Sequence, residues 1–288
     1  MKHITILALL LLTTVNVAAA DKIKLTANDI ISRADESSWR VVGNENILKI
    51  SLPTGAAYIE LNTQLAPKHS NNIKKLARSG FYQGLNIYRF VEEFVAQGGD
   101  LTGEKPVHHA QKQLPAEFYH TTLNPLAITE LAGPDGYAEK TGFLNGFAVA
   151  QNTAQTRTWQ VHCSGIFAMA RDNDINTGGT EFYVTLGGAQ RYLDRNVTVF
   201  GRVLEGMEHF YRLRRHAVAG EQFNPITDIQ VLADISATDN SQFRVLKTNS
   251  NTFKQLIRAR KNRTEPWFVA RPNYIDVCAM PIPTERLK

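Results

Sequence analysis

Apolar and polar residues alternate along much of the chain with the period of a β-strand. The alternation covers residues 48–52 and 57–61, and a turn at Pro53–Gly55 separates the two runs, which together predict a β-hairpin. Pro67 then takes the favoured first position of a predicted helix that ends at Gly80. Further short strands are predicted at 87–90, 94–97, 166–170, 182–186, 197–203 and 226–235, and a second helix at 207–213.

This pattern of many short strands and two core helices indicates a mostly β protein. A closed antiparallel barrel capped by the two helices accounts for it, because closure removes the exposed edges of an open sheet. The pattern loosens at 102–160, which predicts a long loop insertion. We therefore expect a lead-in segment at 21–44, a barrel domain at 45–236 and a C-terminal extension at 237–288 with a helix near 253–260.

The first twenty residues differ from the rest in composition. Lys2 precedes a dense apolar run and small residues follow at Ala18–Ala20, which is the arrangement of a secretory signal peptide at 1–20. A membrane anchor is the alternative, but 4–17 is shorter than the roughly 20 apolar residues of a spanning helix and includes Asn16. We expect cleavage after the alanines, export, and no stable membrane insertion of the mature protein.

The charge of the chain is weakly positive. The formal net charge is +5, and removal of Lys2 with the signal peptide lowers it to +4. The most basic run, Lys254–Arg263, is typical of one solvated helix face, so we expect no nucleic-acid partner.

The two cysteines, Cys163 and Cys278, lack the paired spacing of a zinc site. Export favours an oxidising compartment, in which a disulfide between them is possible. Such a bridge would close a loop of about 115 residues and stabilise the protein by about 4–5 kcal/mol in the chain-entropy model. Two free buried thiols are the alternative, and the sequence leaves the choice open.

One set of motifs occurs in a fixed order along the chain. It consists of Tyr88–Phe90, Phe94–Asp100, Gly165–Arg171, Gly178–Val184, Tyr192–Asp194 and Val199–Met207. The ordered set resembles the signature of the cyclophilin family from Leu48 to about Ile235. The resemblance implies an eight-stranded barrel with a helix at each end, peptidyl-prolyl cis-trans isomerase activity, and an active-site groove on the outer face of the barrel.

The segments outside the predicted barrel resemble the longer cyclophilins of Gram-negative bacteria. The likeness lies in Ala116–Phe118 and in the glycine–phenylalanine pairs within 142–147. Together with the predicted signal peptide, it implies a periplasmic protein whose partners are proline-containing unfolded or exported polypeptides. We expect this protein to be a monomer.

The implied reaction explains why an arginine is important. Rotation about a peptide bond faces a barrier of roughly 18–20 kcal/mol, and uncatalysed X-Pro isomerisation takes tens to hundreds of seconds. No bond breaks, so no nucleophile, metal or other cofactor is required, and we expect none. A cation that donates to the prolyl nitrogen stabilises the twisted transition state more than the ground state. Arginine suits this task because it stays charged and presents a rigid fork of donors.

The resemblance assigns this role to Arg89, for which an ordinary surface ion pair is the alternative. It further implies that Gln97 binds the substrate backbone and orients Arg89. The implied walls of the proline pocket are Phe94, Met169, Tyr183 and Leu193, with Ala170 and Arg171 at the rim. Ordinary core packing is the alternative for Phe94, Met169 and Leu193.

Five positions in this region depart from the residues that are common in the family. Histidine, glutamine, phenylalanine, tryptophan and histidine are common where this chain has Tyr88, Glu181, Tyr183, Tyr192 and Val197. The three tyrosines keep an aromatic surface, and Glu181, Tyr183 and Tyr192 are included in the predicted substrate groove. Glu181 brings a carboxylate near Arg89, which either orients or partly neutralises the guanidinium. Tyr192 predicts weak inhibition by cyclosporin.

Other chemistries have little support in the sequence. His162 and Cys163 are adjacent on an extended chain and point to opposite sides, which disfavours a cysteine hydrolase. No metal-binding spacing joins the histidines, and the Gly178-Gly179 turn lacks the Lys-Ser/Thr of a phosphate loop. The serious alternative is a non-catalytic proline-peptide binding module or holdase chaperone that uses the same groove.

Overall fold

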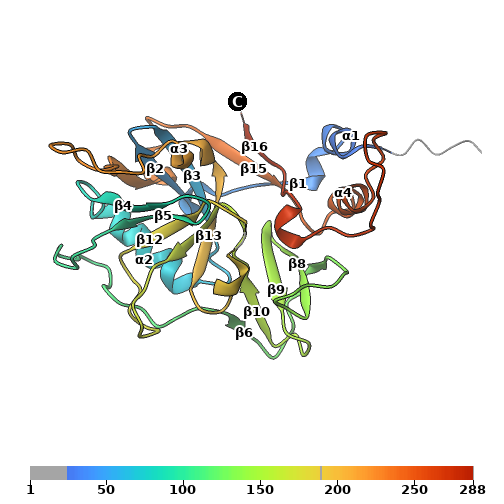
Figure 1. The fold of residues 1–288 in the computed structure, drawn as a ribbon, viewed down its shortest axis with the longest axis horizontal. Coiled ribbons are helices and arrows are strands. Elements are labelled where there is room, and N and C mark those ends of the chain that lie inside the picture. Colours follow the sequence, from blue (N-terminus) through green and yellow to red (C-terminus); the bar gives the residue numbers. More distant parts are fainter. Residues whose placement is uncertain (1–24, 189, 288) are drawn as a thin grey trace, which may run out of the picture.

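The structure is a computed structural model that describes residues 25–188 and 190–287. The predicted signal peptide, 1–20, lies outside the described residues. Within them, sixteen strands form three sheets, and all the strand pairs are antiparallel (Figure 1). The α-helices are α1 (Ala27–Ser32), α2 (Pro67–Arg78), α3 (Met207–Tyr211) and α4 (Asn251–Lys261).

The largest sheet has eight strands and curls around the main hydrophobic core. Its order is β14-β2-β3-β13-β11-β12-β5-β4, so the predicted hairpin of β2 and β3 lies next to the edge strand β14. The strands are β2 (Ile47–Leu52), β3 (Gly55–Leu61), β4 (Asn86–Val91), β5 (Val95–Gly99), β11 (Ile166–Met169), β12 (Phe182–Thr185), β13 (Val199–Glu205) and β14 (Asp228–Val231). Inward-facing side chains from these strands pack with apolar residues of α2 and α3.

The sheet is a curled half-barrel, and the prediction of a closed barrel was wrong. Its edge strands, β4 and β14, are not paired with each other, and the chain just before β14 contacts the start of β4 through a bridge between Asn86 and Pro225. Two backbone hydrogen bonds flank the bridge, from Ile87 to Asn224 at 2.9 Å and from Ile226 to Leu85 at 2.8 Å. No ladder continues from this bridge into β14, so the two edges of the sheet are not joined along their length.

Helix α2 begins as predicted, with Pro67 in its first turn. Residue Ala66 provides no side-chain cap, and the carboxylate of Glu117 instead accepts the backbone N–H groups of Lys68 and His69 at 3.0 Å each. A carboxylate at a helix N-terminus satisfies unpaired donors and faces the positive end of the helix dipole. The segment after residue 102 therefore helps to define where this barrel helix starts.

Residues 120–160 form a sheet of their own, so the prediction of a loop insertion was wrong for this part, whereas 102–119 contains no helix or strand. The five strands of this sheet are ordered β6-β10-β9-β8-β7. They are β6 (His120–Thr121), β7 (Thr129–Glu130), β8 (Lys140–Leu144), β9 (Phe147–Gln151) and β10 (Arg157–Gln160). The missed signal is Asn145-Gly146 between β8 and β9, because both residues have positive φ (49° and 86°), as a two-residue hairpin turn requires.

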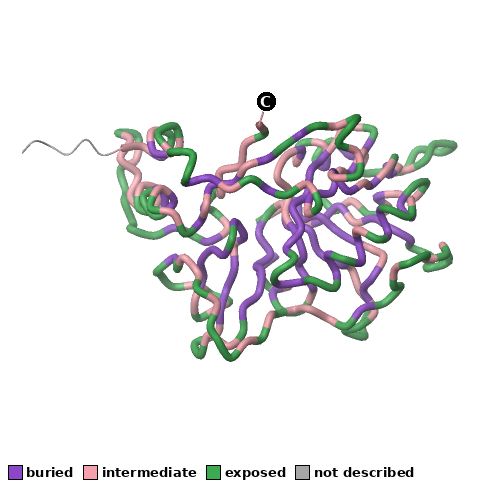
Figure 2. The backbone as a smooth tube through the Cα atoms, turned by 180° about the vertical axis from the view of Figure 1, so that it is seen from behind, coloured by how far each residue is buried: buried purple, intermediate pink, exposed green. Residues whose placement is uncertain are grey.

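The lead-in segment and the C-terminal extension come together in space. Strand β15 (Gln242–Leu246) pairs with both β1 (Trp39–Val41) and β16 (Thr284–Leu287) in the third sheet, and α1 lies against α4 (Figure 1). Buried residues of α1, α4, the insertion sheet and the outer face of the half-barrel form one apolar cluster. Buried backbone accordingly runs through the strands of both larger sheets (Figure 2). Among the described residues, no helix combines the length and apolar character needed to cross a membrane.

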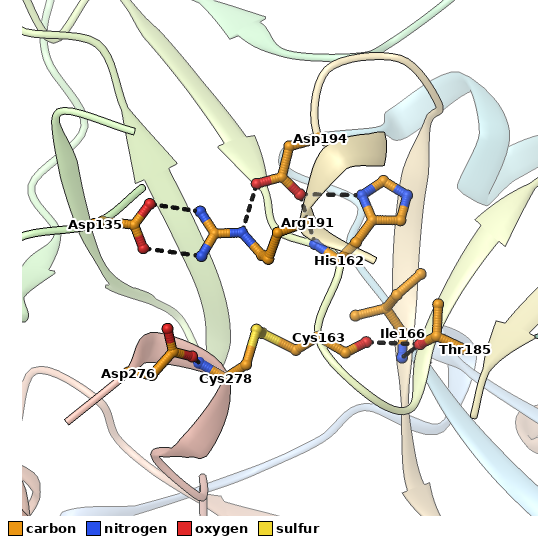
Figure 3. Close-up of a disulfide and its surroundings, with 9 residues drawn as sticks. All are labelled: Asp135, His162, Cys163, Ile166, Thr185, Arg191, Asp194, Asp276 and Cys278. Atoms are coloured by element: carbon orange, nitrogen blue, oxygen red, sulfur yellow. Dashed lines mark hydrogen bonds and ion pairs between the residues drawn. A yellow bond between two sulfur atoms is a disulfide. The ribbon is translucent and has the colours of Figure 1, made fainter. Parts of the chain in front are cut away.

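A disulfide joins the extension to the half-barrel, so of the two alternatives for the cysteines the structure contains the bridge. Cys163 and Cys278 have Cα atoms 4.9 Å apart and are separated by 115 positions in sequence (Figure 3). Cys163 lies between β10 and β11, and its carbonyl accepts the Thr185 hydroxyl at 2.6 Å. Cys278 lies in a short 3₁₀ helix, Val277–Ala279. A cysteine hydrolase is excluded at this pair, because Cys163 has no free thiol.

We expect the double variant Cys163→Ala/Cys278→Ala to lose about 4 kcal/mol of unfolding free energy, because the unfolded chain regains the entropy that the cross-link removes. Urea unfolding followed by tryptophan fluorescence measures this loss. The wild type in reductant should approach the variant, and the variant should not respond to reductant. Identical unfolding curves for oxidised and reduced wild type would contradict the expectation.

Candidate active site

Cross-strand pairs place the predicted catalytic residue, Arg89, and two predicted substrate-binding residues on one face of the sheet. Arg89 on β4 pairs with Gln97 on β5, Gln97 pairs with Tyr183 on β12, and Tyr183 pairs with Ala168 on β11. Residues directly opposite each other in an antiparallel sheet point to the same side. This register directs the Arg89, Gln97 and Tyr183 side chains to the outer face of the half-barrel.

A cleft of about 700 Å³ lies over this face. Seven of the predicted site residues line it, namely Arg89, Phe94, Gln97, Ala170, Arg171, Tyr183 and Leu193. Phenylalanine, leucine and the tyrosine ring supply apolar walls, while the arginines and the glutamine supply the donors that would orient a peptide. The residues that the resemblance places in one groove are thus largely brought together.

Arg89 projects a guanidinium that is free to interact with a ligand. Its Nη1 donates to Oε1 of Gln97 at 3.2 Å, and its Cζ lies 5.3 Å from the centre of the Phe94 ring. Over the range that the structure describes, no carboxylate lies within ion-pair distance of Arg89. The alternative of an ordinary surface ion pair therefore does not describe this residue.

Glu181 acts on Arg89 only through two other side chains. The Tyr88 hydroxyl donates to Oε2 of Glu181, and Nε2 of Gln97 donates to the Tyr88 oxygen. Burial raises the pKa of Tyr88, and the neighbouring Glu181 carboxylate raises it further, so the hydroxyl keeps its proton. Because both ends of the Gln97 amide are engaged, its oxygen is held toward Arg89. Glu181 and Tyr88 line a smaller adjoining pocket of about 250 Å³.

Met169 lies in the core of the half-barrel, and the prediction that it walls the proline pocket was wrong. Its side chain is 1% exposed and packs in the same cluster as Phe182, its cross-strand partner. Strand alternation explains the result, since Ala168 and Ala170 on either side of Met169 face the outer cluster. Core packing was the alternative reading for Met169.

Tyr192 is not among the residues that line the cleft. It lies in a 3₁₀ helix, Arg191–Leu193, and is 56% exposed. Its neighbour Leu193 does line the cleft. The short helix therefore presents one of the two predicted contact residues to the cleft and leaves the other at the surface.

Sequence reasoning missed several residues of the cleft. Val95 and Val197 contribute to its walls, and Asp172–Asp174 with Thr177 form one side of its rim. Val95 could have been found, because it lies two positions before Gln97 on the same strand and therefore shares its face. The rim loop carries no comparable periodic signal.

His162, which the sequence did not connect to the groove, lies directly behind it. Nε2 of His162 is 2.9 Å from the hydroxyl of Tyr183, whose pKa is raised by burial. The described part of the chain contains no group of three or more His, Cys, Asp or Glu side chains arranged to hold a metal ion. His162 is thus a hydrogen-bonding partner of the cleft wall.

We expect Phe94→Ala to weaken binding of a proline-containing peptide by about tenfold or more, because an apolar wall of the cleft is removed. Met169→Leu, a swap of similar volume in the core, should leave binding within about twofold and cost less than about 1.5 kcal/mol of stability. Isothermal titration and thermal unfolding separate the two effects. If Met169→Leu weakened peptide binding as much as Phe94→Ala, Met169 would have to line the proline pocket, contrary to its place in the core.

Comparison with known proteins supports the likeness of family and fold. Residues 47–233 match the family model described as cyclophilin type peptidyl-prolyl cis-trans isomerase/CLD. Peptidyl-prolyl cis-trans isomerase-like 1 of Rhizopus delemar is 31% identical over 169 residues, which cover 59% of this chain and 79% of that protein. Its namesake in Mus musculus is 28% identical over 179 residues, covering 62% of this chain and 84% of that protein.

One solved structure extends the likeness beyond the family domain. The crystal structure of cyclophilin AquaCyp293 from Hirschia baltica has a TM-score of 0.72 and 26% sequence identity, and the match covers 92% of this chain and 98% of that one. The matched region therefore takes in more than the curled sheet. From the family match, the register of the site and this shared architecture, the chain belongs to the cyclophilin family of peptidyl-prolyl cis-trans isomerases.

Proposed function

We propose that this protein accelerates X-Pro isomerisation during the folding of exported proteins, with Arg89 as the catalytic residue and no covalent intermediate. The observation that carries the proposal is the Arg89 guanidinium, which has no carboxylate partner among the described residues and is oriented by Gln97 beside Phe94. A proline ring in the cleft would bring its nitrogen toward this cation.

The proposed mechanism depends on a difference between ground and transition states. As the prolyl amide twists, its nitrogen regains a lone pair and becomes a better acceptor. A guanidinium N–H then forms a stronger hydrogen bond with it, which lowers the rotation barrier. The apolar walls formed by Phe94, Tyr183 and Leu193 would hold the ring while the preceding residue rotates. No metal or cofactor takes part in these steps.

The site of action that we propose is the periplasm of a Gram-negative cell. Support comes from the basic, apolar and small-residue order of 1–20. The disulfide between Cys163 and Cys278 adds to this support, because such bonds persist mainly in oxidising compartments. In that compartment the substrates would be unfolded, proline-containing exported chains, bound by a monomer.

Arg89→Ala is expected to lower kcat/KM by about 10²–10³-fold, the usual effect of removing one oriented donor from a transition state. Arg89→Lys should recover only part of the activity, since lysine keeps the charge but lacks the rigid fork. A protease-coupled assay with a proline-containing peptide measures both.

The control for this comparison is Arg33→Ala, which removes an exposed arginine at the end of α1 and outside the cleft. It should have wild-type activity. If wild type and Arg89→Ala both show the uncatalysed rate, the catalytic proposal fails, and retained peptide binding would favour the non-catalytic binding module or holdase.

Export should remove residues 1–20. In a Gram-negative host, we expect the full chain to yield a periplasmic protein whose intact mass corresponds to a start at Asp21, with both cysteines oxidised. A variant that lacks 2–20 should remain in the cytoplasm with reduced cysteines. An uncleaved full-length protein in the membrane fraction would support the anchor instead.

A further inference from the structure

A chain of buried polar groups leads away from the cleft behind Tyr183. The Tyr183 hydroxyl lies 2.9 Å from Nε2 of His162, and Nδ1 of His162 lies 3.2 Å from Oδ1 of Asp194. The backbone N–H of His162 donates to the same oxygen at 2.8 Å. All three residues are buried, and His162 is completely so. Because these polar groups are shielded from water, each relies on its neighbour in the series for a hydrogen bond.

The ionisation of Asp194 determines the direction of these hydrogen bonds. Burial opposes its ionisation, but hydrogen bonds from His162 and the charge of Arg191 hold the pKa of Asp194 below its ordinary value. An ionised carboxylate can only accept, so it takes the Nδ1–H of His162 and leaves Nε2 to face the Tyr183 hydroxyl. Burial raises the pKa of Tyr183, so the hydroxyl keeps its proton and donates to Nε2.

Arg191 continues the chain into the insertion sheet (Figure 3). Its Nε donates to Oδ2 of Asp194 at 2.7 Å, and its two terminal nitrogens donate to the two oxygens of Asp135 at 2.9 Å each. Asp135 lies between β7 and β8, and its Oδ1 also accepts the backbone N–H groups of Tyr137 and Ala138 at 2.9 Å each. This bidentate contact holds Arg191 in both distance and angle.

Further contacts hold the connection between the insertion sheet and the cleft in place. The residue after His162 is Cys163, whose carbonyl accepts the Thr185 hydroxyl of β12 and whose disulfide joins it to Cys278 of the C-terminal extension. Tyr183 shares its buried cluster with Trp159 of β10. His162 is the link between these elements, because it lies in the short connection from β10 to β11.

We propose that Asp135, Arg191, Asp194 and His162 are positioning residues for Tyr183, so that the insertion determines how the cleft holds a proline ring. This inference rests on the proposed function, because it concerns the same cleft. A phenylalanine in place of Tyr183 would have no hydroxyl for such a link. The positioning therefore arises from residues that this chain combines.

The first test is Asp135→Asn, which keeps the shape of the side chain but removes its charge. We expect kcat/KM and the affinity for a proline-containing peptide to fall by about fivefold or more, the usual size of coupling within one buried network. The matched control is Glu130→Gln, an exposed carboxylate on β7 whose nearest cation is Lys140 at 3.7 Å. It should stay within about twofold of wild type.

A double-mutant cycle separates positioning from a general loss of stability. In the Tyr183→Phe background the hydroxyl link is absent, so Asp135→Asn should change kcat/KM and peptide affinity by less than about twofold. Its effect on thermal unfolding should be similar in both backgrounds. Equal losses of kcat/KM in the two backgrounds would overturn the proposal, because the effect would not pass through the Tyr183 hydroxyl.

A substitute variant and a second readout cover the cases in which Asp135→Asn does not fold or the wild type shows no turnover. If Asp135→Asn does not fold, Arg191→Lys enters the same cycle, since it keeps the charge and loses the bidentate contact. If the wild type shows no turnover above the uncatalysed rate, the catalytic proposal is wrong, and the cycle is decided by peptide affinity alone. A wild type with neither turnover nor peptide binding overturns both proposals.

Discussion

The antiparallel register of β4, β5 and β12 is the constraint on which the cleft depends. Because side chains alternate across each strand, this register directs Arg89, Gln97 and Tyr183 outward and sends Phe182 into the core. A slip of one residue would exchange the two faces and would expose large apolar side chains. The free energy of core packing therefore also maintains the relative positions of the guanidinium, the amide and the tyrosine ring.

The parts outside the half-barrel support this arrangement from behind. The insertion sheet, α4 and the outer face of the half-barrel bury one common apolar cluster, and a disulfide holds the C-terminal extension against it. The same region contains the buried Arg191, whose guanidinium contacts Asp135 on one side and Asp194 on the other. A buried charge is tolerated only when it is well paired, so the insertion and the cleft constrain each other.

Much of the half-barrel follows from period-two alternation, which predicts the β2–β3 hairpin and the strands around Arg89. The same rule, applied across Ala168–Ala170, would have placed Met169 in the core, where the structure has it. The strands of the insertion were not predicted for a different reason. The Asn145-Gly146 hairpin signal lies in a segment whose strands bury both faces and show little alternation. Closure of the barrel also could not be predicted, because it depends on hydrogen bonds between segments far apart in sequence.

The sequence by itself determined the family, the short strands that contain Arg89 and Gln97, and the residue types that suit isomerisation, because these depend on local spacing and on an ordered set of motifs. Only the tertiary structure decided what surrounds them. His162, Asp194, Arg191 and Asp135 meet because strands from two sheets pack together, and no short-range pattern records that contact. For the same reason, the route by which Glu181 reaches Arg89 through Tyr88 and Gln97 became visible only in three dimensions.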